Sequence, residues 1–342
     1  MRLLALGLLS LLSLFGDLAA AVRTKVDLVN LTPDIRPGEK ALIAMRFRCD
    51  PHFHIYWKNP GDAGQSPTVE WQEKSGATVG DFVWPGPKML DQSGVYNFVY
   101  EDETLLLMEV AVPAGAKGAL TFKGKAEWLE CDDSGCWPHD KQVELTVQVG
   151  AGNVAYKYDP KLYPTLRPRL TTTATSDGKS LTVAVPAGEK LPQTWFPERG
   201  FVAPTATAKQ KQAGGNVVFE LADATEKLDS GELIFTTRAA DGGFVDIKAV
   251  LGGAPAKAAP GPAATPTKTT GEWQPWSPEA QAKALAEGKT VYVDFTARWC
   301  ATCQVNKRVY TQGDVAQALS SAGVVMLKAD WTKKDEVIAQ EL

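Results

Sequence analysis

The sequence predicts a multidomain protein with two β-rich units, a linker and a smaller α/β unit. Two observations lead to this fold class. Short alternating apolar stretches, separated by Gly and Pro, fill residues 22–251, as is typical of β-sandwich proteins. A Pro- and Ala-rich segment follows at 252–271, and strand-like and helical patterns then alternate as far as residue 342. The 342 residues, 44% of them hydrophobic, are enough for two or three domains.

Residues 1–21 have the organisation of an export signal peptide. Arg2 supplies a positive start, an apolar run covers 3–15, and the alanines at 19–21 form a small-residue cleavage site. The apolar run is short for a membrane-spanning helix, and an uncleaved anchor is the alternative. No other run of 18 apolar residues is present. We therefore expect a soluble mature chain that starts at Val22 and lies in the bacterial periplasm.

The charges are nearly balanced, with 36 Lys and Arg against 40 Asp and Glu and a formal net charge of −4. Because the two signs are interspersed, nothing indicates a nucleic-acid-binding groove or a polybasic membrane patch.

The first unit, residues 22–150, is predicted to be an all-β sandwich. Alternating apolar residues predict strands at 22–30, 41–49, 105–112, 120–128 and 143–149. Cys49 alternates in phase with Met45 and Phe47, which predicts a buried, inert thiol.

Cys131 and Cys136 form a cysteine pair at the end of one predicted strand and before the next. The four residues between them, 132–135, include Gly135 and can fold back so that the sulfurs meet. A ring this small gains little from loop-closure entropy, which favours a redox switch. A structural hairpin disulfide is the alternative.

His52, His54 and His139 are the only histidines of the chain. His52 and His54 would share one face of an extended segment, so a metal site there is an alternative. Packing or surface roles are the interpretation we favour, and we expect no metal and no cofactor.

The second unit, residues 151–251, has strand-like patterns at 181–185, 217–221, 232–237 and 244–250 and contains neither Cys nor His. We interpret it as a structural or docking domain without redox chemistry. The linker at 252–271 has four prolines and no aromatic residue, so an extended, mobile segment is expected.

The last unit covers residues 272–342. Ser277 and Pro278 predict the start of a helix that ends at Gly288. A strand at 291–296 then leads into Cys300 and Cys303. Further elements are expected near 314–321, 324–329 and 334–342. About 70 residues are too few for a complete thioredoxin sheet, so we expect an incomplete domain or a fragment.

Cys300 and Cys303 form a CxxC motif at a strand-to-helix junction, which predicts a thioredoxin-type redox site. The helix N-terminus would stabilise the Cys300 thiolate as the attacking group, and Cys303 would resolve the mixed disulfide. Asp294, six residues before Cys300, would exchange the proton of Cys303. The alternatives are a structural zinc half-site and an inert buried pair, but zinc would need two more ligands and none lies nearby.

Several motifs of both ends resemble the DsbD/ScsB-type transmembrane thiol:disulfide reductase family. In the first unit they are HIYWKNPGDAG at 54–64, WPGP at 84–87, NFVYE at 97–101 and the Cys131…Cys136-Trp137-Pro138 stretch. In the last unit they are VDFTA at 293–297, WCATC at 299–303 and ADWT at 329–332. Phe196-Pro197 in the second unit fits the ScsB-like branch.

This resemblance implies an immunoglobulin-like first domain and a thioredoxin-like last domain. Members of the family are anchored in the inner membrane. They pass cytosolic electrons through a membrane domain to the thioredoxin-like domain, then to the immunoglobulin-like one. The resemblance implies that Cys300 attacks Cys136, and that Phe98 and Tyr100 fall where the family has a loop capping the outer cysteines.

The sequence departs from the family pattern in three ways. The linker stands in place of the membrane domain, the thioredoxin fold stops early, and Lys307 occupies a position that is often acidic, which would alter the pKa of the cysteines.

We therefore expect a periplasmic protein-disulfide reductase. Its partners would be thioredoxin-fold proteins of the disulfide isomerase or cytochrome c maturation type, and a separate membrane protein is a candidate electron donor. The alternatives are a non-catalytic docking scaffold and a copper-handling protein.

Overall fold

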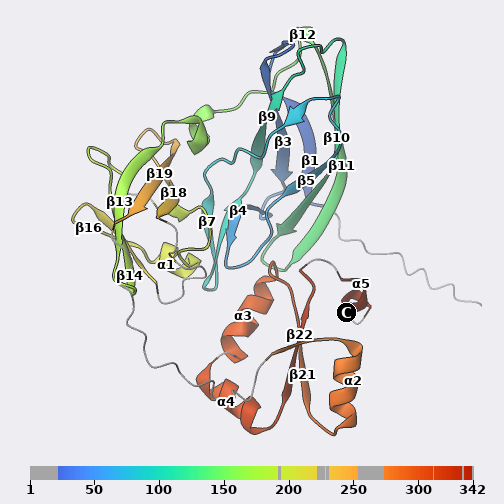
Figure 1. The fold of residues 1–342 in the computed structure, drawn as a ribbon, viewed down its shortest axis with the longest axis vertical. Helices are drawn as coiled ribbons and strands as arrows, with labels where there is room; N and C mark the ends of the chain where they lie inside the picture. Colours follow the sequence, from blue (N-terminus) through green and yellow to red (C-terminus); the bar gives the residue numbers. More distant parts are fainter. Residues whose placement is uncertain are drawn as a thin grey trace, which may run out of the picture.

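A computed structural model describes residues 22–191, 194–221, 228, 231–252, 273–310, 312–332 and 335–340. The predicted signal peptide and almost all of the predicted linker lie outside these residues. Figure 1 shows three bodies: a β-sandwich, a second β-rich domain beside its β4–β7 side, and an α/β domain below the β10–β11 hairpin. We call them the first, middle and last domains.

The first domain is a sandwich of antiparallel sheets with the orders β1-β3-β9-β6 and β11-β10-β5, extended by a third sheet, β4-β8-β7, and by the small pair β12-β2. Its strands are β1 (Thr24–Asn30), β2 (Asp34–Ile35), β3 (Lys40–Cys49), β4 (Ile55–Gly61), β5 (Thr68–Glu73), β6 (Thr78–Val79), β7 (Lys88–Gln92), β8 (Val95–Tyr100), β9 (Glu103–Ala111), β10 (Ala119–Cys131), β11 (Cys136–Gln148) and β12 (Gly150–Ala151). All five predicted strands of this domain are confirmed.

The period-2 pattern of the sequence sets which face of each strand is buried. In β1, Thr24, Val26, Leu28 and Asn30 are buried and the residues between them are more exposed. The large aromatic side chains Phe47, Phe122 and Trp128 fill the space between the sheets. Burial of this apolar surface is the main contribution to the stability of the domain.

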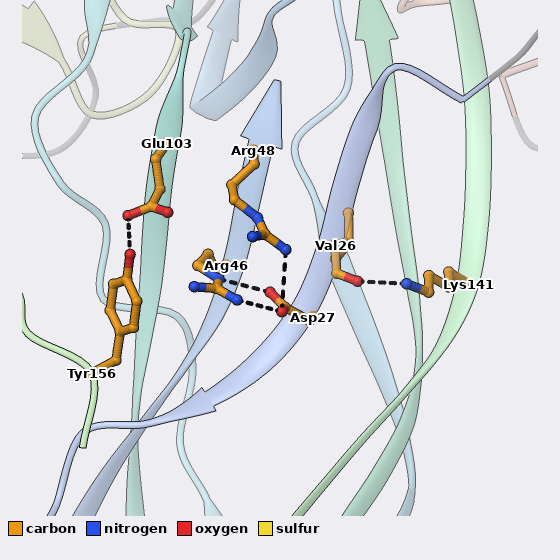
Figure 2. A network of polar contacts seen from close by, with 7 residues as sticks. All are labelled: Val26, Asp27, Arg46, Arg48, Glu103, Lys141 and Tyr156. Atoms are coloured by element: carbon orange, nitrogen blue, oxygen red, sulfur yellow. Dashed lines mark hydrogen bonds and ion pairs between the residues drawn. The ribbon is translucent and has the colours of Figure 1, made fainter. Parts of the chain in front are cut away.

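The outer face of β1 and β3 carries a polar network (Figure 2). Arg46 donates to both oxygens of Asp27, at 2.9 and 2.5 Å, and Arg48 adds a third contact at 3.4 Å. The guanidinium of Arg46 also lies 4.8 Å from the ring centre of Tyr156, whose hydroxyl donates to Glu103 at 2.6 Å. The chain that leaves the sandwich is thus held against its sheet.

The middle domain is built on one seven-stranded sheet with the order β15-β18-β19-β13-β14-β17-β16, in which β13 and β19 pair in parallel. Its elements are the 3-10 turns η1 (Pro160–Leu162) and η2 (Pro164–Leu166), the strands β13 (Leu170–Ser176), β14 (Ser180–Ala184), β15 (Phe196–Pro197), β16 (Lys211–Ala213), β17 (Asn216–Glu220), β18 (Glu232–Arg238) and β19 (Phe244–Leu251), and the helix α1 (Pro204–Ala208). Trp195, Phe201, Phe219 and Phe235 form its core. The four predicted strands are confirmed.

The last domain has a parallel sheet with the order β20-β22-β21. Its elements are β20 (Gln274–Pro275), α2 (Pro278–Ala286), β21 (Val291–Thr296), α3 (Ala301–Tyr310), α4 (Gly313–Ser321), β22 (Val325–Asp330) and α5 (Glu336–Ala339). The Ser277 side chain accepts a hydrogen bond from the Ala280 N–H, which confirms the predicted helix start. Among the described residues, no helix is both long and apolar enough to span a membrane.

Candidate redox site

The first cysteine pair closes the longest hairpin of the first domain. Cys131 and Cys136 are the last residues paired in the β10–β11 ladder and form a disulfide. The loop between them is held by the Asp132 carboxylate, which accepts from the N–H groups of Ser134, at 2.7 Å, and Gly135, at 3.1 Å. The predicted fold-back of four residues is therefore confirmed.

The two sulfurs of this disulfide lie in different surroundings. Cys131 is buried, with 1% of its surface exposed, whereas Cys136 is only half-buried. Tyr56, Val99 and Leu129 pack around Cys131, with Leu90 at the rim of the same cluster. A thiolate approaching from solvent therefore meets the Cys136 sulfur first.

Tyr56 places a polar group beside the disulfide. Its hydroxyl donates a hydrogen bond to Cys131 Sγ at 2.9 Å and lies 3.7 Å from Cys136 Sγ. His54 Nε2 lies 3.3 Å from the same hydroxyl. Burial raises the pKa of Tyr56 well above its ordinary value, so the phenol stays neutral and can donate at neutral pH.

His54 is fixed to the cysteine strand by its backbone. Its N–H and C=O pair with the C=O and N–H of Cys131 at 3.0 and 3.1 Å. Burial lowers the pKa of the imidazole to about 4, so the ring is neutral at pH 7. The motif at 54–64 contains both Tyr56 and His54. Their contacts with Cys131 could not be predicted, because Tyr56 and Cys131 are 75 residues apart in the sequence.

The second cysteine pair lies where β21 leads into α3. Cys300 and Cys303 form a disulfide, and the N–H of Cys303 lies 3.2 Å from Cys300 Sγ as a donor. Free N–H groups at a helix start stabilise a thiolate. The structure therefore places Cys300 at the predicted helix N-terminus.

Asp294 is buried on β21, as the sequence suggested, and its carboxylate accepts a hydrogen bond from the Tyr310 hydroxyl at 2.8 Å. Tyr310 belongs to α3 and packs on Trp273, with ring centres 5.0 Å apart. Proton exchange between Asp294 and Cys303 stays a prediction. On the same helix, burial and the charge of Lys328 lower the pKa of Lys307.

The structure brings the residue before the second cysteine pair into contact with the cluster around the first pair. Trp299, the residue before Cys300, packs against the cluster that holds Tyr56 and Cys136. Its carbonyl accepts a hydrogen bond from the Gly64 N–H at 3.2 Å. In Figure 1 an end of α3 approaches the tip of the β10–β11 hairpin.

Gly64 is required at this contact. Its φ of +103° lies in the region that favours glycine, and a Cβ at this position would overlap the Tyr56 ring. The absence of a side chain lets the loop lie flat on Tyr56 and present its N–H to Trp299.

The expectation for Phe98 and Tyr100 needs correction. Both are core residues of strand β8: Phe98 is fully buried, and the Tyr100 hydroxyl donates to the Pro85 carbonyl at 2.6 Å. Because side chains alternate along a strand, Val99 between them is the residue that faces the disulfide. The contacts over the cysteines come instead from Leu90, Val99 and Tyr56.

Cys49, His52 and His54 do not come together at one site. Cys49 was predicted to be buried; it is only partly buried but packs against the sandwich core, and burial raises the pKa of its thiol to about 11. His52 is exposed in a turn with a φ of +72°, whereas His54 is buried. The two histidines therefore do not share a face. Among the described residues, no cluster of three or more His, Cys, Asp and Glu is placed to hold a metal.

Comparison with known proteins supports the fold of both ends. Residues 25–148 match the family model for the N-terminal domain of the thiol:disulfide interchange protein DsbD, and residues 272–342 match a thioredoxin-like family model. No curated protein matches the chain.

Two solved structures are similar to parts of the chain. The N-terminal periplasmic domain of ScsB from Proteus mirabilis covers 68% of this chain and 92% of its own, at 15% identity and a TM-score of 0.45. The reduced N-terminal domain of DsbD from Neisseria meningitidis covers 36% of this chain and 85% of its own, at 15% identity and a TM-score of 0.23. By its two family matches, the chain joins a domain that matches the N-terminal domain of DsbD to a thioredoxin-like domain.

Proposed function

We propose that the protein passes reducing equivalents from the Cys300–Cys303 pair to the Cys131–Cys136 pair, and from there to periplasmic proteins. Thiol–disulfide exchange is supported by the two matched domains, each of which carries a cysteine pair. The internal step is supported by one observation: Trp299 packs on the cluster that contains Cys136. The direction is the one that the resemblance to the DsbD/ScsB-type family implies. The protein would thus be a thiol:disulfide oxidoreductase acting as a reductase.

The proposed exchange balances as two successive displacements. The Cys300 thiolate attacks Cys136 Sγ, the Cys131–Cys136 bond breaks, and Cys131 leaves as a thiolate. The Cys303 thiolate then attacks Cys300 Sγ and releases Cys136. The Cys300–Cys303 pair is oxidised to a disulfide, the Cys131–Cys136 pair is reduced to two thiols, and two electrons and two protons are transferred.

Neighbouring groups would stabilise the thiolates that form during the exchange. The N–H of Cys303 would hold the attacking Cys300 thiolate, and the Tyr56 hydroxyl would hold the departing Cys131 thiolate. Asp294 would accept the proton of Cys303. Attack on Cys136 instead of Cys131 is favoured because Cys131 is buried beneath Tyr56 and Val99.

The proposed location and partners are those that the resemblance to the DsbD/ScsB-type family implies. We propose a periplasmic protein that reduces thioredoxin-fold partners of the disulfide isomerase or cytochrome c maturation type. A separate membrane protein would supply its electrons. Cys136 is the less buried sulfur of its pair, so these partners would bind to the same surface that Trp299 contacts. The last domain and a partner would therefore bind there in turn.

A trapping experiment tests the internal step. Full-length protein with Cys303→Ala and Cys131→Ala lacks both resolving thiols, and on oxidation it should form a Cys136–Cys300 bond that peptide mapping detects. The matched control, Cys303→Ala with Cys136→Ala, should trap far less, because the remaining Cys131 is buried. Free thiols or random intermolecular dimers in the first variant would contradict the relay. Absence of insulin reduction with dithiothreitol would favour a docking scaffold.

A further inference from the structure

The sheet β4-β8-β7 separates the redox pair from the middle domain. Its strands alternate, so Tyr56 and Val99 face the disulfide, whereas Trp57 and Phe98 belong to the core on the other side. A displacement of β4 or β8 would therefore move side chains on both faces together.

The middle domain reaches the far face of this sheet with Phe196. This residue is 6% exposed and belongs to the core cluster of the first domain, although it lies on β15 of the middle domain. Its ring meets those of Trp57 and Phe98 edge to face, with centres 6.3 and 5.3 Å apart. Such aromatic pairs are favourable beyond the area they bury.

Polar contacts also hold strand β4 against the middle domain. Lys58 Nζ lies 2.6 Å from Glu198 Oε1, and Asn59 Nδ2 donates to the Pro197 carbonyl at 2.9 Å. Lys58 and Asn59 directly follow Trp57 on β4. Because the Lys58 side chain is only 20% exposed, this ion pair is screened less than an ordinary surface pair.

A second contact holds the segment that leads into β7, at the other edge of the sheet. The Gly86 N–H donates to the Leu162 carbonyl at 2.9 Å, two residues before β7 begins. A Cβ on Gly86 would overlap the Phe244 ring of β19. The middle domain is therefore packed against both edges of the three-stranded sheet.

We propose that residues 196–198, the supporting segment, position the redox site of the first domain. By seating Phe196 under Trp57 and Phe98, the segment fixes β4 and β8. Tyr56, Val99 and the Gly64 loop then keep the arrangement in which Cys136 receives electrons from the last domain. Phe196 and Glu198 are positioning residues in this proposal, which rests on the proposed function.

The test measures transfer in the full chain. Oxidised protein is mixed with dithiothreitol and quenched with acid, and alkylation followed by mass analysis gives the rate at which the Cys131–Cys136 pair becomes reduced. The same rate in a Cys300→Ala chain is subtracted, which leaves the part that passes through Cys300. We expect Phe196→Ala to reduce this part by about tenfold to a hundredfold, as misplaced reacting groups do. Glu198→Gln should reduce it by about twofold to fivefold, as for loss of one ion pair.

Matched variants separate positioning from loss of stability. Leu181→Ala removes a fully buried side chain from the middle-domain core, in a cluster that contains no residue of the first domain, and Glu220→Gln removes the exposed ion pair to Lys211. Both should keep wild-type transfer, and Phe196→Leu should restore most of it. Equal losses in Phe196→Ala and Leu181→Ala, when their unfolding midpoints match, would overturn the proposal. If wild type shows no transfer that depends on Cys300, the proposed function itself fails.

Discussion

The Tyr56 hydroxyl donates a hydrogen bond to the sulfur of Cys131, the buried member of the outer disulfide, at 2.9 Å. Tyr56 and Cys131 are 75 residues apart in the sequence. Their contact gives the disulfide one sulfur that is exposed to attack and another that leaves next to a donor. Predictions for both roles follow from this asymmetry.

Removing the Tyr56 hydroxyl should slow reduction of the outer disulfide. A hydrogen bond to a charged group contributes about 1.5–3 kcal/mol, so Tyr56→Phe should lower the rate with dithiothreitol by about tenfold or more. Tyr158→Phe, which changes a phenol outside this cluster, is the control. An unchanged rate in Tyr56→Phe would mean that the hydroxyl does not stabilise the Cys131 thiolate.

His54 should make stability depend on pH in acid. Burial lowers its folded-state pKa from 6.5 to about 4, so the neutral ring is favoured by folding. Its contribution is fully present above pH 6.5 and is lost as the pH falls through 4. It amounts to roughly 3 kcal/mol. Urea unfolding of wild type and His54→Gln between these pH values measures it, and parallel curves would refute it.

Cys300 should be the more reactive thiol of the CxxC pair. Its sulfur lies at the start of α3, 3.2 Å from the N–H of Cys303, which favours the thiolate. Iodoacetamide at neutral pH should modify Cys300 of the reduced protein about tenfold faster than Cys303. Preferential labelling of Cys303 would reverse the proposed roles.

Cys49 should contribute packing and no turnover. Its raised pKa, about 11, leaves the thiol protonated at neutral pH and therefore a poor nucleophile. Cys49→Ala should keep full insulin-reduction activity and lose about 1 kcal/mol in the free energy of unfolding. A folded but inactive variant would show that Cys49 takes part in exchange.

Gly64→Ala should weaken the contact between the first and last domains. Its Cβ would overlap the Tyr56 ring, and its φ is positive. Gly118→Ala is the matched control, because Gly118 also has a positive φ, +70°, but a Cβ there meets nothing within 4 Å. Both variants carry the backbone cost of about 1 kcal/mol, and only Gly64→Ala should also lose transfer from Cys300 to Cys136.

Local patterns were enough to predict much of the fold. The strands of the sandwich, the hairpin loop at 132–135 and the helix start at Ser277 each depend on residues close together in the sequence. The CxxC motif likewise carries its chemistry within four residues. These features depend on side-chain period and capping, which a single sequence displays directly.

Contacts between distant segments could not be predicted in this way. The family resemblance places Phe98 and Tyr100 where the family has a loop that caps the outer cysteines, but strand alternation turns both side chains into the core. The meeting of Trp299 with Tyr56 and the seating of Phe196 under Trp57 depend on how whole domains pack. The hydrophobic periodicity of a single sequence does not indicate how domains pack together.

The parallel pairing of β13 with β19 affects the order in which the protein is completed during synthesis. β13 begins at Leu170 and β19 ends at Leu251, so the sheet of the middle domain cannot close until nearly all of that domain has been made. The first domain ends its last strand at Ala151 and can fold earlier. The hairpin with Cys131 and Cys136 is therefore assembled about a hundred residues before Phe196 is held in place. A newly made chain thus passes through an interval in which the Cys131–Cys136 hairpin is complete but the Phe196 ring beneath Trp57 and Phe98 is not yet held in place.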